Sequence, residues 1–108
     1  MVKINDTELE RLIDNNISNA IKHSTKDSII TVNLKNHNDS IKLEFLSKGS
    51  IIKDVSKIFE KNYTENNSAK RSLGLGLSMV KNICQKNDIK YLVNSSEGVN
   101  SFTYVFNV

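Results

Sequence analysis

Apolar residues near the start of the chain recur at the spacing of an amphipathic helix. At about 100° per residue, one face collects Leu9, Ile13, Ile17, Ala20 and Ile21. Thr7 and Glu10 have the spacing of a capping box, in which a hydroxyl and a carboxylate satisfy free amides at a helix start. The pattern therefore predicts a helix that begins close to Thr7 and ends near His23 or Ser24.

Strand-like segments occur in two pairs. Residues 29–34 and 41–46 flank a polar turn at 35–39, and apolar residues alternate with charged ones in the second segment. Such alternation is typical of a strand with one buried face. Residues 89–94 and 102–108 form a similar pair around a second turn, so the sequence predicts two hairpins.

The middle of the chain contains a short helix, a loop and a longer helix. A short helix fits residues 54–59, whereas residues 62–72 are polar, lack periodicity and indicate a mobile loop. Residues 75–86 are amphipathic at helical spacing. This order of elements predicts an α+β fold, a two-layer sandwich with a mostly antiparallel sheet covered by about three helices.

Composition narrows the class of protein. The chain has 108 residues, which suits a single domain, and none of its apolar stretches approaches the length needed to cross a membrane. No secretory signal pattern is present, and the lone Cys84 suits a reducing compartment and core packing. The net charge of +3 is spread over scattered lysines without interleaved aromatics. We expect a cytoplasmic domain without direct membrane contact and without a nucleic-acid partner.

Three polar residues share one stripe of the first predicted helix. At helical spacing, Asn15, Asn19 and Lys22 cluster opposite the apolar face. Amide oxygens can ligate Mg²⁺ beside phosphates, and a lysine offsets phosphate charge. Taken alone, however, the three residues are better explained as the solvated face of an amphipathic helix.

A second candidate site lies at the start of the last predicted helix. Gly74 and Gly76 form a glycine-rich turn there, which lets the backbone approach a phosphate closely. Lys70 and Arg71 precede the glycines, and on charge alone they are better explained as part of a solvated loop. A glycine pair of this kind is by itself a weak signal.

Residues 15–24 resemble the asparagine box of the ATP-binding domain of bacterial sensor histidine kinases, N-x-x-x-N-A-x-K and an aromatic residue. The resemblance implies that Asn19 ligates Mg²⁺ and that Asn15 is its neighbour in the phosphate and metal network. It also implies that Lys22 contacts phosphate and that His23 flanks adenine, although an ordinary histidine at a helix end is an equal explanation. Related ATPases that hydrolyse ATP carry a glutamate at the position of Asn15, and an amide cannot act as that base.

Other segments extend the resemblance over almost the whole chain. Gly74-Leu75-Gly76-Leu77 looks like the second glycine box, with Ser72-Leu73 where the family usually has another glycine, and residues 58–63 match the phenylalanine box. The first glycine box, D-x-G-x-G, retains Gly49 but has Ser47 for the aspartate that contacts adenine and Ile51 for the second glycine. A neutral hydroxyl in place of a carboxylate weakens affinity roughly tenfold. The implied nucleotide-binding residues are Asn15, Asn19, Lys22, His23, Ser47, Gly49, Ile52, Phe59, Tyr63, Lys70, Arg71, Leu73, Gly74, Leu75, Gly76 and Leu77.

The resemblance implies a Bergerat-type ATP-binding sandwich that uses ATP and Mg²⁺. Its implied activity is protein-histidine phosphorylation in two-component signalling, with Asn15, Asn19 and Lys22 organising the reaction. Residues 1–108 then form the catalytic domain of a longer kinase. The resemblance is compatible both with a membrane-anchored parent kinase and with one that has no anchor. Its partners are the histidine-containing dimerisation domain of that kinase and, indirectly, a response regulator. The alternatives are a degenerate interaction module, favoured by Ser47 and Ile51, and a serine kinase of the anti-sigma-factor type, disfavoured by Asn15.

Overall fold

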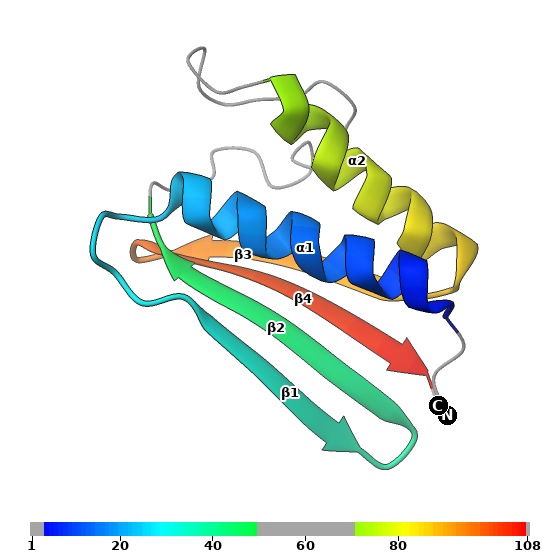
Figure 1. Cartoon of the computed structure of the whole chain (residues 1–108). Coiled ribbons are helices and arrows are strands. Elements are labelled where there is room, and N and C mark those ends of the chain that lie inside the picture. Colours follow the sequence, from blue (N-terminus) through cyan, green and yellow to red (C-terminus); the bar gives the residue numbers. More distant parts are fainter. Residues whose placement is uncertain (1–3, 50–70, 108) are drawn as a thin grey trace.

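The computed structural model describes residues 4–49 and 71–107, with only the backbone described at 71–75. Figure 1 shows a sheet with helices packed on one of its faces. The elements in chain order are α1 (Asp6–His23), β1 (Thr31–His37), β2 (Ser40–Lys48), α2 (Arg71–Lys86), β3 (Lys90–Ser96) and β4 (Val99–Asn107). The short helix predicted at 54–59 and most of the predicted loop lie outside the described residues.

The four strands form one antiparallel sheet in the order β1-β2-β4-β3. Residues 38–39 connect β1 to β2, and Glu97 and Gly98 connect β3 to β4. Both Glu97 and Gly98 have positive φ values, 53° and 77°, as tight two-residue hairpins require. The two hairpins are joined through β2 and β4, so the predicted two-layer α+β sandwich is confirmed.

The core lies between the helices and the sheet. Every second residue of β4 from Phe102 onward is aromatic and buried, and Phe45 of β2 packs edge-on against Tyr104 with ring centroids 6.1 Å apart. The buried cluster comprises Leu12, Leu43, Phe45, Leu77, Val80, Ile83, Cys84, Ile89, Phe102, Tyr104 and Phe106. Burial raises the pKa of the Cys84 thiol to about 12, so Cys84 is a core residue, as predicted.

The buried face of α1 agrees with the predicted one only in part. Leu9, Ile13 and Ile17 pack partly buried against the core, and Ala20 is buried. Leu12, Asn16 and Ala20 form its most buried row, whereas Ile21 is 61% exposed. Asn16 is accommodated because its amide donates to the carbonyl of Leu12 at 2.8 Å and its Oδ1 accepts from the Tyr104 hydroxyl at 2.8 Å. Asn16 can therefore occupy the buried face of α1, although the pattern of apolar residues did not place it there.

The boundaries of the elements also depart from the sequence prediction. The residue that caps α1 is Asn5, whose Oδ1 accepts from the Glu8 amide at 2.7 Å, so the predicted capping box at Thr7 and Glu10 is wrong. The strands are longer than predicted, because pairing within each hairpin continues into residues that were expected to form the turns. β1 ends at His37 and β3 ends at Ser96. The last helix begins at Arg71 and not at Leu75.

Candidate functional site

Three chain segments meet at the C-terminal end of β2, on the left of Figure 1. The Thr25 amide donates to the carbonyl of Lys48 at 2.6 Å, which holds the segment after α1 against β2. The Gly49 amide donates to the carbonyl of Gly98 at 3.0 Å, which brings in the β3–β4 turn. A Cβ atom at Gly49 would overlap the carbonyl oxygen of His23. Glycine at position 49 therefore permits the last turn of α1 to lie directly on the end of β2.

The two helices contact each other through Asn15 and Gly76. A Cβ atom at Gly76 would lie 2.6 Å from Oδ1 of Asn15, so only glycine accepts this side chain without a shift. Gly76 and Gly74 lie inside α2, and the prediction of a glycine-rich turn ahead of the helix is wrong. The backbone of α2 continues through both glycines, and at Gly76 the lack of a side chain lets α1 approach closely.

The predicted polar stripe of α1 lies beside the buried row and not opposite it. Asn15 and Asn19 are half-buried, whereas Lys22 and His23 are exposed at the end of the helix. The Asn15 amide donates to the carbonyl of Arg11 at 2.7 Å, which leaves its oxygen directed at Gly76. Within residues 4–49 and 71–107, the Asn19 side chain has no hydrogen bond to another described group. Two amide oxygens one turn apart are thus placed on the side of α1 that meets α2.

A buried polar group that the sequence analysis missed lies next to Ser47. Ser47 is 8% exposed, and Asn100 is directly opposite it on β4 and 5% exposed. The Ser95 hydroxyl donates to Oδ1 of Asn100 at 2.6 Å. Asn100 is in phase with Phe102 and Tyr104, so extending the period-two pattern backwards from these aromatics would have placed it on the buried face.

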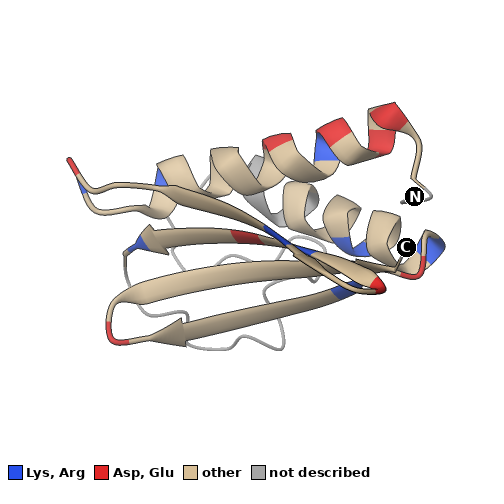
Figure 2. Cartoon of the chain, turned by 90° about the horizontal axis from the view of Figure 1, so that it is seen from below, with Lys and Arg blue, Asp and Glu red and all other residues tan. Residues whose placement is uncertain are grey.

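The charges around the meeting point of the helices suit an anionic ligand. All acidic residues of α1 lie in its first half, from Asp6 to Asp14, as the red bands on that helix in Figure 2 show. The second half of α1 ends with Lys22 and His23, and α2 contains no Asp or Glu. The part of α1 that follows Asp14 and the whole of α2 therefore contribute no acidic side chain that would repel phosphate.

The remaining predicted site residues fall into three groups. Leu77 is 4% exposed and packs in the hydrophobic core, so its side chain faces the core cluster. Arg71, Leu73, Gly74 and Leu75 belong to the first turns of α2, where only the backbone is described. Outside the described residues lie Ile52, Phe59, Tyr63 and Lys70.

The donor set fits a magnesium ion that arrives with a nucleotide. Among the described residues, no group of three or more His, Cys, Asp or Glu side chains could hold a metal ion by itself. Mg²⁺ commonly keeps several waters and takes one or two protein ligands plus phosphate oxygens. Amide oxygens at Asn15 and Asn19 are compatible with that arrangement, with the phosphates supplying the charge.

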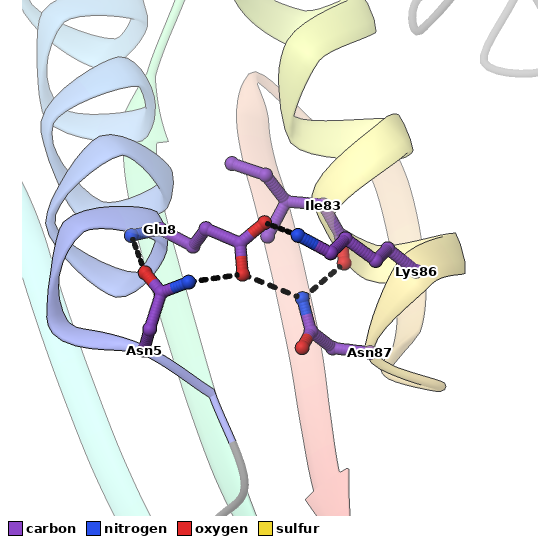
Figure 3. A network of polar contacts seen from close by, with 5 residues as sticks. All are labelled: Asn5, Glu8, Ile83, Lys86 and Asn87. Atoms are coloured by element: carbon purple, nitrogen blue, oxygen red, sulfur yellow. Dashed lines mark hydrogen bonds and ion pairs between the residues drawn. The ribbon is translucent and has the colours of Figure 1, made fainter.

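A polar network fixes the other ends of the two helices, as Figure 3 shows. The Glu8 carboxylate accepts from Nδ2 of Asn5 at 2.9 Å, Nζ of Lys86 at 3.1 Å and Nδ2 of Asn87 at 3.3 Å. Asn87 also donates to the carbonyl of Ile83 at 2.9 Å. The start of α1 is thereby held against the end of α2, which limits how far the helices can shift at Asn15 and Gly76.

Replacing Glu8 by glutamine should lower stability at neutral pH but not in acid. The hydrogen bond from Lys86 holds the pKa of Glu8 below its ordinary value of 4.5, against the opposing effect of burial. A lowered folded-state pKa means that this contribution is present above pH 4.5 and is lost as the pH falls through the folded-state pKa. The urea midpoints of wild type and Glu8→Gln should therefore differ at pH 7 and converge on acidification.

The matched control is Glu10→Gln, on the same helix and exposed. It should leave the difference between neutral and acidic midpoints close to that of the wild type. Parallel pH profiles for the wild type and Glu8→Gln would show that the network does not depend on the ionised carboxylate.

Within the described ranges, no helix combines the length and the apolar character that crossing a bilayer demands.

Comparison with known proteins agrees with this architecture. Residues 4–107 match the family described as histidine kinase-, DNA gyrase B-, and HSP90-like ATPase. Sensor protein VanS of Enterococcus faecium is 31% identical over an alignment of 99 residues, and the match covers 88% of this chain and 26% of that protein. Sensor histidine kinase WalK of Bacillus subtilis (strain 168) is 30% identical over an alignment of 105 residues, and the match covers 90% of this chain and 17% of that protein. The chain thus spans a minor part of these relatives.

Solved structures show the same fold. The nucleotide-free catalytic domain of histidine kinase ThkA superposes with a TM-score of 0.84 at 20% identity, covering 98% of this chain and 70% of that chain. The mycobacterial sensor histidine kinase MprB gives a TM-score of 0.81 at 20% identity, covering 95% of this chain and 72% of that chain. The Bergerat-type fold expected from the motifs is confirmed. With its family match spanning both helices and all four described strands, the chain belongs to the histidine kinase-, DNA gyrase B- and HSP90-like ATPases.

Proposed function

We propose that this chain is the ATP-binding catalytic domain of a two-component sensor histidine kinase. It presents Mg-ATP so that the γ-phosphoryl group is transferred to a histidine on a separate helical dimerisation domain of the parent kinase. A response regulator then receives the phosphoryl group, which makes it an indirect partner. Since the substrate is ATP, the proposed place of the domain is the cytoplasm.

The observation that carries this proposal is the contact between Asn15 of α1 and Gly76 of α2. This contact joins the asparagine box to the second glycine box, the two motifs whose combination is specific for the family. They are about sixty residues apart in the chain. Next to it, Asn19 is half-buried on the same side of α1, and Lys22 follows at the exposed end of the helix. Amide oxygens and a lysine around a helix–helix contact suit a bound triphosphate.

The proposed roles follow from the chemistry of each side chain. Asn19 is the protein ligand for Mg²⁺, Asn15 supports it, and Lys22 offsets phosphate charge. The bound ion would neutralise charge on the phosphate oxygens. Ser47 and Gly49 line the base end, while Lys70 and Arg71 contact phosphate. His23, Ile52, Phe59, Tyr63, Leu73 and Leu75 complete the proposed nucleotide contacts.

Transfer to another protein, and not hydrolysis, is favoured by Asn15. A general base must accept a proton, and a side-chain amide does not do so at neutral pH. The Asn15 amide is also committed to the carbonyl of Arg11. The domain therefore contributes positioning and charge neutralisation, and the attacking nitrogen comes from the acceptor histidine.

Radioactive phosphoryl transfer tests this proposal. The chain is incubated with γ-labelled Mg-ATP, alone and together with the separately produced helical histidine domain of its parent kinase. We expect label that is stable in base and labile in acid, on the histidine domain and only when both proteins are present. Release of inorganic phosphate by the chain alone, with no labelled histidine, would contradict the proposal and indicate a hydrolase.

A further inference from the structure

We propose that the buried hydrogen bond between Asn16 and Tyr104 fixes how α1 is rotated about its own axis, and thereby positions the side of the helix that binds Mg-ATP. Asn16 and Tyr104 are positioning residues, since both are buried beneath the helix and away from the nucleotide. The inference rests on the proposed function, because the side chains that the pair positions are Asn15 and Asn19. Asn16 occupies an unspecified position of the asparagine box, and Tyr104 lies outside every motif.

The apolar residues of α1 do not by themselves explain the observed rotation of the helix. They are Leu9, Leu12, Ile13, Ile17, Ala20 and Ile21. At about 100° per residue, their centre lies roughly 50° away from Asn16 around the helix axis. The structure instead buries Asn16 at the centre of the face, between Leu12 and Ala20, and leaves Ile21 61% exposed. Burial of apolar surface alone therefore favours a different rotation, in which Ile21 turns towards the sheet.

The observed rotation is the one that suits the proposed site. Asn15 and Asn19 lie on the flank of the buried row that faces α2, where Oδ1 of Asn15 meets Gly76. Turning the helix by roughly 50° to centre its apolar residues on the sheet would carry both amides away from α2 and towards solvent. The Glu8 network holds the first turn of α1, whereas Asn16 is adjacent to Asn15 and acts at the site itself.

The partner of Asn16 is itself firmly held. Tyr104 lies on β4, between β2 and β3, and its fully buried ring packs edge-on against Phe45. Its hydroxyl donates to Oδ1 of Asn16 at 2.8 Å, and the Asn16 amide donates to the carbonyl of Leu12 at 2.8 Å. Burial raises the pKa of the Tyr104 hydroxyl, so it stays protonated and remains a donor. A turn of α1 would separate two buried polar groups, and the bond therefore specifies one rotation.

Two variants separate a positioning role from a contribution to stability. Tyr104→Phe removes only the hydroxyl and leaves the Asn16 oxygen buried without its partner, so both the urea midpoint and the affinity for Mg-ATP should fall. Asn16→Leu combined with Tyr104→Phe replaces the pair by apolar groups and should return the urea midpoint to that of the wild type or above. By calorimetry, this double variant should still bind Mg-ATP about tenfold more weakly than the wild type, because nothing then holds the rotation. Recovery of affinity together with stability would overturn the inference.

Thiol labelling follows the rotation without any nucleotide. Ile21→Cys adds an exposed thiol to α1, and the native Cys84 does not compete because it is buried and has a pKa of about 12. In the double-variant background, labelling at position 21 should slow severalfold as α1 turns this position towards the sheet. Ser18→Cys is the control on the exposed side of α1 and should label equally fast in both backgrounds.

The two measurements distinguish failure of the inference from failure of the proposed function. An unchanged labelling rate at position 21 would overturn the inference, while Mg-ATP binding by the wild type would leave the proposed function standing. Absence of Mg-ATP binding by the folded wild-type chain would instead overturn the proposed function itself, and with it the site that the pair is proposed to position.

Discussion

Replacing Gly49 by alanine should destabilise the domain by about 2–3 kcal/mol, because the new methyl group has no space. The atom that it would overlap is the backbone carbonyl oxygen of His23, and not the end of a flexible side chain. The end of α1 is fixed in turn by the Ser24 amide, which donates to the carbonyl of Ala20 at 2.8 Å. Relief of the overlap therefore requires α1 and β2 to separate where Gly49 also bonds to Gly98.

Urea unfolding followed by circular dichroism measures this effect. Gly98→Asn is the matched control, because nothing lies within 4 Å of a Cβ atom there and asparagine tolerates the positive φ of 77°. It should cost less than about 1 kcal/mol. If Gly49→Ala were as stable as Gly98→Asn, the close approach of α1 to β2 at this point would be incorrect.

Replacing Asn19 by alanine should abolish measurable binding of Mg-ATP and leave the fold intact. Asn19 is half-buried beside the helix–helix contact, and its side chain has no hydrogen bond to another described residue, so its loss removes no side-chain bond among residues 4–49 and 71–107. Alanine is also the best helix former, so the helix itself should not suffer. What disappears is the proposed amide ligand for Mg²⁺.

The measurement is titration with ATP in the presence and absence of Mg²⁺, alongside thermal unfolding of the same samples. Ser18→Ala is the control, since Ser18 is the exposed neighbour of Asn19 on α1. We expect Ser18→Ala to bind as the wild type does. If a folded Asn19→Ala protein bound Mg-ATP with unchanged affinity, a residue other than Asn19 would have to ligate Mg²⁺.

The sequence predicted the elements well where short-range signals determine them. Helical periodicity located both described helices, and alternation located the two hairpins. The errors occur at the ends of the helices and strands, where contacts with other elements decide which residue begins or ends the element. The cap of α1 is Asn5 because Glu8, which it contacts, is also held by Lys86 at the end of α2 and by Asn87 just after it. No local pattern at Thr7 and Glu10 contains that information.

The candidate site was predictable in its parts but not in its contacts. The motifs identified Asn15 and Gly76, yet their direct contact depends on how α1 crosses α2. Asn16 was assigned no role because a buried amide depends on the Tyr104 hydroxyl, 88 positions further along the chain. Asn100 was missed for a similar reason, since its significance arises only when β4 pairs with β2 opposite Ser47.

The most direct test of the account is a calorimetric titration of this domain with ATP, with and without Mg²⁺. The account predicts saturable binding that strengthens when Mg²⁺ is present, because the amide oxygens of α1 need the ion to engage the phosphates. A folded sample that gives no heat at millimolar ATP would contradict it. The fold would then serve as a protein-interaction module without nucleotide, with Ser47 as the first residue to explain the loss.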